Sequence, residues 1–434
     1  MKPQEITRAV VSSERGGWIL PFYNSFALSN IPGTIFEFFN IPSKNSFFKN
    51  LPEKFKTLRN QKNLTIIVLL ADGFGYHQWL ANAKHLALFQ AIARKGAFFP
   101  ITTVFPSTTA AAISSLNTGR TPNETGVFEW FLYEPRLNKI IMPLLFSPLG
   151  SEKRDVLTRQ NVSPHILTSQ EIEKSVIHKT FRTHKVRSLA INKDAFVRGG
   201  YNEIFFRGAT KKGYTNARDL SHILRRTIVK SRAGPRFIYV YWADIDKAGH
   251  AHGPSSPEYK REVRALHTLL CNALSGIHKK VAQKTILIIT ADHGQVDVKP
   301  KKTLYLNSFQ WLEKAFMRKN GRPIYPTGGP RDVFLAIQPG RLKEIFSRLR
   351  RVLKNDATVL SIREAHRRKL FGNNAASELF KKRAGNILIL PKRKNTIWYM
   401  HPEGKPMMKK GHHGGLSPDE MLIPFAMAKL SDIV

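Results

Sequence analysis

The stretch "LTIIVLLADG" (residues 64–73) places an unbroken apolar run directly before an acidic residue and a glycine. Two later stretches repeat this design, "RFIYVYWADIDKAGH" (236–250) and "KTILIITADHG" (284–294). Continuous rather than alternating hydrophobicity is typical of strands that are covered on both faces, as in a parallel sheet. The three stretches therefore predict three buried, parallel strands, each followed by Asp.

Helical patterns separate the apolar runs, for example "PEYKREVRALHTLLCNAL" (257–274). This alternation predicts an α/β fold with a doubly wound, mostly parallel sheet. In such sheets, ligands bind just beyond the carboxyl ends of the strands. We therefore expect Asp72, either Asp244 or Asp246, and Asp292 to meet at one edge of the sheet.

The region 301–400 has a different character. It contains "RDVFLAIQ" (331–338) and "GNILILPK" (385–392), two strand-like runs that flank a helical pattern. We interpret this region as a small α+β insertion that forms a lid. The first part of the core then covers residues 1–300, and the chain returns to the core over residues 401–434.

The charge of the chain is strongly positive. Its 434 residues include 69 Lys and Arg against 31 Asp and Glu, which leaves a net charge of +38. Such a charge favours phosphate-bearing partners, but the basic residues are spread along the chain on helix-like patterns, which is typical of solvated helix faces. We therefore expect no stable nucleic-acid complex, and the sequence leaves the oligomeric state open.

Cys271 is the single cysteine, so no disulfide can form within the chain. It lies in an apolar helical pattern, and a catalytic thiol is not expected there. The beginning of the sequence lacks the apolar core of a secretory signal, and no run approaches the ~18 apolar residues that span a bilayer. We expect no transmembrane segment and a cytoplasmic location.

Acidic residues and histidines recur together after the apolar runs. Carboxylate and imidazole are suitable ligands for Zn²⁺ and similar divalent ions. A single Asp after a strand more often caps a helix or a turn, but three equivalent positions favour a shared metal site. Six ligands are too many for one tetrahedral ion and suit two. The candidate ligands are Asp72, Asp246, His250, Asp292, His293 and one of His412 and His413.

A candidate nucleophile lies in "VFPSTTAAAISSLNTGRTPNETGV" (104–127). Hydroxyls at Ser107, Thr108 and Thr109 directly precede a helical segment of small residues. A helix N-terminus favours an anion, and metal coordination favours the alkoxide form of a hydroxyl. An ordinary Ser or Thr helix cap is the alternative interpretation.

In this order, "ADG", "FPSTT", "TG", D-x-x-x-H-x-x-G-P, "ADHG" and "HGG" resemble the alkaline phosphatase superfamily, in particular its type I phosphodiesterase/nucleotide pyrophosphatase branch. The resemblance implies two divalent ions, Zn²⁺ or alternatively Mn²⁺, that flank a nucleophile which is transiently phosphorylated or nucleotidylated. It also implies the ligands. One ion would be held by Asp246, His250 and His413, and the other by Asp72, Asp292, His293 and Thr109.

Thr109 is the preferred nucleophile because its spacing to Thr118 and Gly119 matches that of the family's threonine. His413 is preferred over His412 because it directly precedes the glycine pair. The chain departs from the family at Ala112, where nucleotide pyrophosphatases carry a phosphate-binding Asn. It also has no Arg after Thr109 of the kind that binds a phosphate dianion in alkaline phosphatases, which favours diesters.

The sequence therefore predicts a metal-dependent phosphoric ester hydrolase, a phosphodiesterase or nucleotide pyrophosphatase that acts through Thr109. The expected substrate is a small phosphate ester, with a nucleotide as one candidate. Phe105, Phe128 and Trp130 could stack a base, although such residues are more often part of the core. The alternatives are a phosphomonoesterase, a phosphomutase or phosphotransferase, and a non-catalytic binder of phosphate polymers. The last ranks below the enzymes because the ligand set is intact and the charge is diffuse.

Overall fold

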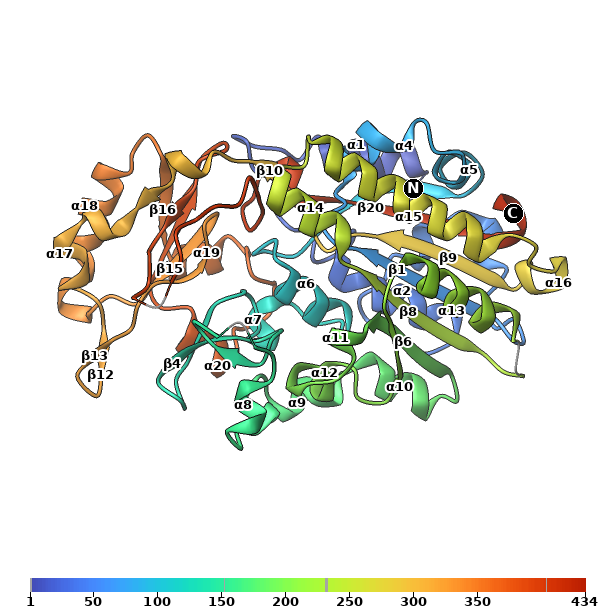
Figure 1. Ribbon diagram of the computed structural model, residues 1–434, viewed down its shortest axis with the longest axis horizontal. Helices are drawn as coiled ribbons and strands as arrows, with labels where there is room; N and C mark the ends of the chain where they lie inside the picture. The colour runs from blue at the N-terminus through green and yellow to red at the C-terminus, as the bar shows by residue number, and fades with distance from the viewer. Residues whose placement is uncertain (1, 152, 231–232, 403) are drawn as a thin grey trace.

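The computed structural model describes residues 2–151, 153–230, 233–402 and 404–434. Its centre is a seven-stranded sheet with the order β2-β20-β9-β1-β8-β6-β7 (Figure 1). The strands are β1 (Thr65–Ala71), β2 (Ala97–Thr102), β6 (Arg187–Lys193), β7 (Thr210–Tyr214), β8 (Arg236–Trp242), β9 (Thr285–Thr290) and β20 (Leu422–Lys429). All neighbouring pairs from β9 to β7 are parallel, and β20 runs antiparallel to both of its neighbours. The prediction of a mostly parallel sheet in an α/β fold is confirmed.

The three predicted strands are direct neighbours, with β1 between β8 and β9. Leu69 of β1 lies opposite Val240 of β8 and Ile289 of β9, and all three side chains are fully buried. Burial on both faces explains why the sequence of these strands is continuously apolar. Because the strands are parallel and in register, the segments that follow them emerge at the same edge of the sheet.

Helices cover both faces of the central sheet (Figure 1). On one face α4 (Tyr76–Ala83), α5 (Ala87–Lys95) and α15 (Pro257–Leu274) pack in a row, as the ring contacts of Phe89 with Trp79 and His267 indicate. The predicted helix 257–274 is confirmed. Ser256 caps it by accepting the N–H of Tyr259, and Pro257 occupies its first turn. On the other face lie α2 (Ile31–Phe38) and α10 (Ile177–Thr183).

The region 301–400 contains a second, antiparallel sheet with the order β14-β15-β17-β16. Its main elements are β14 (Thr327–Gly329), β15 (Asp332–Leu335), α18 (Leu342–Val352), β16 (Ala357–Ser361), α20 (Glu378–Arg383) and β17 (Ile387–Pro391). This sheet lies beyond one end of the central sheet (Figure 1). The strand–helix–strand pattern is found where the sequence predicts it, while the domain boundaries at 300 and 400 and the role as a lid stay predictions.

The chain leaves the core and returns to it at one place. Strand β10 (Val296–Asp297) pairs antiparallel with β19 (Gly411–His412), and Val296 lies opposite His412. The returning chain then enters the central sheet as β20, between β2 and β9. The segment after the insertion is therefore part of the main sheet.

Aromatic side chains attach the insertion to the core. Phe128 lies 5.1 Å from Phe334 and 4.8 Å from Phe380, and Phe105 lies 5.4 Å from Phe371, measured between ring centroids. Phe105 and Phe128 are fully buried, so neither ring is free to stack a ligand. For these two residues the alternative interpretation, a place in the core, is correct.

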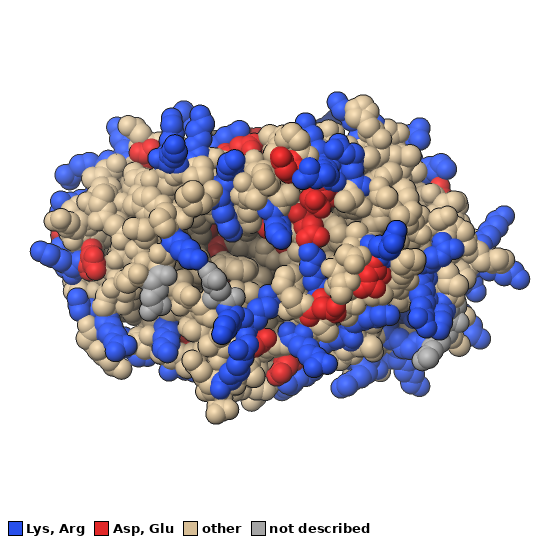
Figure 2. Space-filling view, in the orientation of Figure 1, with Lys and Arg blue, Asp and Glu red and all other residues tan. Residues whose placement is uncertain are grey.

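The surface agrees with a diffuse distribution of positive charge. Figure 2 shows Lys and Arg over both halves of the visible face.

Among the described residues, no helix has the combined length and apolar character that crossing a membrane requires. The cytoplasmic location stays a prediction.

Candidate metal centre and nucleophile

The loop after β1 brings Asp72 to the edge of the sheet. The backbone N–H of Asp72 donates to the carbonyl of Trp242, at the end of β8, over 2.9 Å. Gly73 follows with φ +70°, and a Cβ at this position would lie 3.0 Å from the Cα of Asp246. The glycine of "ADG" is thus required both by its left-handed backbone and by the close approach of the segment that carries Asp246.

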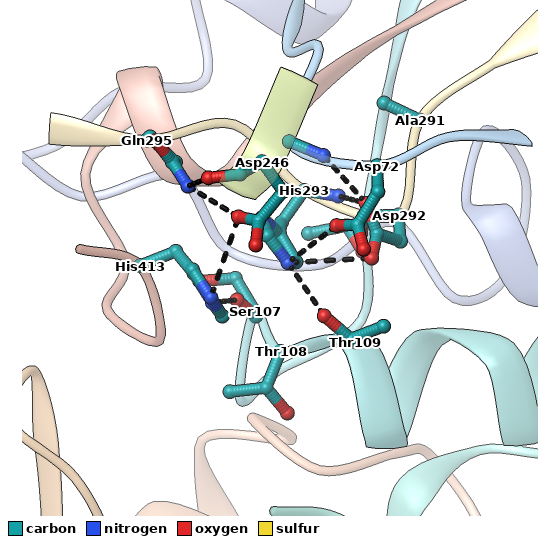
Figure 3. Close-up of polar contacts among 12 residues, drawn as sticks. Asp72, Ser107, Thr108, Thr109, Asp246, Ala291, Asp292, His293, Gln295 and His413 are labelled. Atoms are coloured by element: carbon teal, nitrogen blue, oxygen red, sulfur yellow. Dashed lines mark hydrogen bonds and ion pairs between the residues drawn. The ribbon is translucent and has the colours of Figure 1, made fainter. Parts of the chain in front are cut away.

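Asp72, Asp292 and His293 form one group of potential ligands. Their ligand atoms lie within 4.8 Å of one another, and all three residues are buried. His293 Nε2 is 3.5 Å from Asp72 Oδ1 and 3.3 Å from Asp292 Oδ2 (Figure 3). The loops after two adjacent strands therefore meet as the sequence predicts.

The two carboxylates of this group are only partly satisfied by the protein. Asp292 Oδ1 accepts the N–H groups of Gly73 (3.0 Å) and His293 (2.9 Å), and Asp72 Oδ2 accepts the hydroxyl of Tyr241. Within the described part of the chain, Asp72 Oδ1 and Asp292 Oδ2 are buried and have no hydrogen-bond partner. Burial raises the pKa of both carboxyls, and the charge of Asp292 raises the pKa of Asp72 further. A cation at these two oxygens would offset that cost, so this donor set fits a divalent ion.

Asp246, His293 and His413 form the second group, again with ligand atoms within 4.8 Å of one another. His413 Nε2 is 3.9 Å from Asp246 Oδ1, and its ring stacks on that of His293 at 3.6 Å between centroids. Asp244 instead pairs with Lys193 Nζ. Of the two acidic residues left open by the sequence, Asp246 is the one that faces the site.

Asp246 does not directly end a strand. Strand β8 ends at Trp242, and Asp246 lies in the first turn of α14 (Asp244–His252). His250 follows one turn later on the same helix, with its Nε2 3.4 Å from Asp246 Oδ2. The four-residue spacing therefore reflects the helix, since residues i and i+4 share a face.

Each of the three histidines has one ring nitrogen bound to a backbone carbonyl. The Nδ1 atoms of His250, His293 and His413 lie 2.7, 3.1 and 2.9 Å from the carbonyl oxygens of Gly411, Gly294 and Ser107. Such a bond assigns the proton to Nδ1 and leaves Nε2 as the free electron pair. Burial lowers the pKa of His293 to about 4 and that of His250 to about 3. Both rings are therefore neutral near pH 7, the form that binds metals.

The neighbouring His412 faces another environment. Its Nε2 lies 3.1 Å from Met407 Sδ, and its side chain is buried beside the β10–β19 pair. Adjacent residues of an extended chain point to opposite sides, so only one of the two histidines can reach Asp246. The structure places His413 in that position.

The three candidate hydroxyls also have different environments. Thr109 Oγ1 lies 3.1 Å from His293 Nε2, whereas Ser107 Oγ donates to the carbonyl of Gly415 (2.7 Å) and Thr108 Oγ1 to that of Phe128 (3.3 Å). Figure 3 shows Thr109 directed toward the carboxylates and Thr108 directed away from them. Thr108 occupies the N-cap position of α6 (Thr109–Leu116), but its side chain makes no cap hydrogen bond. The interpretation of Thr108 as a side-chain cap is therefore wrong.

Two polar residues near the ligands were not found by sequence reasoning. Tyr241 donates to Asp72, and Gln295 Nε2 donates to Asp246 Oδ1. Burial strongly raises the pKa of Tyr241, so its phenol keeps the proton that it donates. A hydroxyl near the end of a buried strand was an available signal for Tyr241. The sequence offers no comparable signal for Gln295.

The fold and the site define a class of protein: a mostly parallel α/β protein with two adjacent groups of Asp and His and a hydroxyl at a helix start. The family model "Type I phosphodiesterase / nucleotide pyrophosphatase" matches residues 66–416. The chain belongs to this family, which confirms the resemblance to that branch of the alkaline phosphatase superfamily.

Two curated relatives match parts of the chain. Mouse (Mus musculus) ectonucleotide pyrophosphatase/phosphodiesterase family member 1 is 31% identical over 80 residues, 18% of this chain and 9% of the relative. The rat (Rattus norvegicus) protein of the same name is 24% identical over 211 residues, 48% of this chain and 21% of the relative. The matches thus span less than a quarter of the length of either relative.

The solved structures with a similar fold include the following two, each at 17% sequence identity. Murine ectonucleotide pyrophosphatase/phosphodiesterase 5 has a TM-score of 0.60, with 83% of this chain and 87% of that chain covered. Phosphonoacetate hydrolase from Sinorhizobium meliloti, in complex with phosphonoformate, has a TM-score of 0.58, with 84% and 90% covered. At this identity the likeness supports the fold alone.

The adjacent histidines provide a matched test of the second ligand group. His413→Ala should bind about one divalent ion fewer per chain than the wild type, because one Nε2 ligand is lost. His412→Ala should keep the wild-type stoichiometry, because His412 faces Met407. Elemental analysis after zinc loading and gel filtration measures both. Equal metal contents in the two variants would contradict the assignment of His413.

The raised pKa of Asp72 and Asp292 predicts a pH-dependent metal affinity. In the metal-free protein, these carboxyls hold protons at a higher pH than usual, and a cation must displace those protons to bind. Zinc affinity should therefore fall as the pH is lowered and rise as it is raised. Chelator competition over a series of pH values that extends well below neutrality tests this expectation. An affinity that is constant over this range would contradict it.

Proposed function

We propose that this chain is a metal-dependent phosphoric ester hydrolase of the phosphodiesterase/nucleotide pyrophosphatase type, with Thr109 as its nucleophile. The observation that carries the proposal is the 3.1 Å contact of Thr109 Oγ1 with His293 Nε2, at the place where both ligand groups meet. Membership of the family supports the reaction class.

We propose two divalent ions, Zn²⁺ with Mn²⁺ as the alternative. When bound, such ions polarise the phosphoryl oxygen and stabilise negative charge on the attacking and leaving oxygens. The donor chemistry supports this assignment, since buried carboxylate oxygens that no described residue hydrogen-bonds lie next to neutral imidazole nitrogens. The residues that would hold the ions are Asp246, His250 and His413 for one, and Asp72, Asp292, His293 and Thr109 for the other.

The chain itself supplies the nucleophile and backbone donors. Thr109 Oγ1 attacks phosphorus, the bond to the leaving oxygen breaks, and water then hydrolyses the phosphorylated or nucleotidylated Thr109. Thr109 also begins α6, whose first-turn N–H groups have no partner within the helix. We propose that these N–H groups bind a phosphate oxygen in place of the Asn that nucleotide pyrophosphatases carry at the position of Ala112.

The residues after Thr109 favour a diester over a monoester. Positions 110–112 are all alanine, so the first turn of α6 provides no cationic side chain for the second charge of a phosphate dianion. A nucleotide is a suitable substrate because Trp130, 37% exposed, is available to stack a base. We further propose that residues 301–400 restrict which substrates enter, and that the protein acts in the cytoplasm.

Hydrolysis of bis-p-nitrophenyl phosphate tests the role of Thr109. Thr109→Ala should lose activity by several orders of magnitude, whereas Thr109→Ser should keep measurable activity because a hydroxyl remains. Thr108→Ala is the matched control and should keep activity, since its hydroxyl is bound to the carbonyl of Phe128. Full activity in Thr109→Ala would contradict the proposal.

The same assay separates the related reaction types. With metal added back, the wild type should hydrolyse bis-p-nitrophenyl phosphate and nucleotide diesters faster than p-nitrophenyl phosphate. A preference for p-nitrophenyl phosphate would indicate a monoesterase. Transfer of the phosphoryl group to an added alcohol without net hydrolysis would indicate a phosphotransferase.

A further inference from the structure

A buried ion pair joins the insertion to the returning chain. Arg331, directly before β15, donates from Nε to Glu420 Oε1 over 2.9 Å and from Nη2 to Glu420 Oε2 over 2.8 Å. Its Nη1 donates to the carbonyl of Asn395. The two side chains are 1% and 0% exposed. This bidentate geometry fixes both the distance and the orientation of the two groups.

Glu420 contacts both loops that carry histidines of the site. Its Oε1 accepts the N–H of Gly415, two residues after His413, over 3.0 Å. Its backbone carbonyl accepts the N–H of Gly294, directly after His293, over 3.0 Å. One residue therefore holds the two loops whose imidazole rings stack at 3.6 Å.

Asp332, which directly follows Arg331, packs against the segment that follows His413. A Cβ at Gly414 would lie 2.5 Å from Asp332 Oδ1, and Gly414 has φ +128°, which side chains rarely adopt. Gly414 directly follows His413, so the insertion touches the chain immediately beside the histidine. The Arg331–Glu420 ion pair and the packing of Asp332 on Gly414 therefore both act on the segment directly after His413.

We infer that Arg331 is a positioning residue: its ion pair with Glu420 sets the places of His413 and His293, so that metal binding depends on a residue of the insertion. This inference rests on the proposed metal ligands. Without Arg331, the Glu420 carboxylate would be buried without its charged partner, a costly arrangement that the two loops can relieve by moving. In this proposal the insertion supports the metal centre structurally, in addition to its proposed role as a lid.

The chain offers a matched control in a second buried ion pair. Arg383, also in the insertion, donates to Glu134 of β3 (Leu132–Glu134), and both side chains are 0% exposed. Its other donors reach the carbonyls of Gly126, Ile166 and Leu167. Loss of Arg383 should therefore weaken the docking of the insertion without touching the loops of His293 and His413.

The experiment compares Arg331→Met with Arg383→Met in the full chain. Zinc affinity is measured by chelator competition, and the visible spectrum of the Co²⁺-loaded protein reports ligand geometry. Arg331→Met should weaken zinc binding by about 10- to 100-fold and alter the Co²⁺ spectrum. Arg383→Met should lower the melting temperature but keep the wild-type affinity and spectrum. Arg331→Lys keeps the charge and loses the bidentate geometry. Its zinc affinity should lie between that of the wild type and that of Arg331→Met.

The possible outcomes are distinct. Equal zinc affinity in the Met variants, or a wild-type affinity in Arg331→Met, would overturn the positioning role and leave the proposed function standing. If Arg331→Met does not fold, Arg331→Lys with wild-type affinity and spectrum would overturn it. Failure of the wild type to bind any divalent metal would contradict the proposed function itself, and the positioning role with it.

Discussion

The carboxylates of Asp72 and Asp292 lie together and are buried, and each has one oxygen that forms no hydrogen bond with any described residue. Two unneutralised carboxylates in such a place are costly, so the arrangement requires either bound protons or a cation. The Nε2 atoms of three neutral imidazoles lie near the carboxylates of the site. These imidazoles belong to His250, His293 and His413. Protons alone would satisfy the carboxylates, but they would not explain this arrangement of histidines. The proposed metal site depends on the need to neutralise these two buried carboxylates.

The fold brings the candidate ligands together by joining segments that are far apart in the sequence. Parallel pairing of β1 with β8 and β9 brings the loop of Asp72 next to the loop of Asp292 and next to α14, which carries Asp246. The returning chain adds His413, because β20 enters the sheet on the far side of β9. The Arg331–Glu420 ion pair then ties the insertion to the loops of both stacked histidines. The candidate metal ligands and the packing of the insertion are thus parts of one arrangement.

The main sheet and most of the site could be predicted because their signals are local. Buried parallel strands read as continuous apolar runs, and the residues that follow such strands must share an edge. In the sequence, only the family resemblance favoured Thr109 over Thr108 as the nucleophile. In the structure, the two differ in the partners of their hydroxyls. Arg331 and Glu420 are 89 residues apart, and no local pattern distinguishes a buried Arg from the many exposed ones. Such pairs depend on the tertiary fold, which the sequence pattern does not specify.

Anomalous diffraction from crystals grown with zinc, with data on both sides of the zinc absorption edge, tests the central claim most directly. We expect two peaks: one among Asp72, Asp292, His293 and Thr109, and one among Asp246, His250 and His413. Peaks only at the protein surface, or an ordered site without any peak at saturating zinc, would contradict the proposed metal centre.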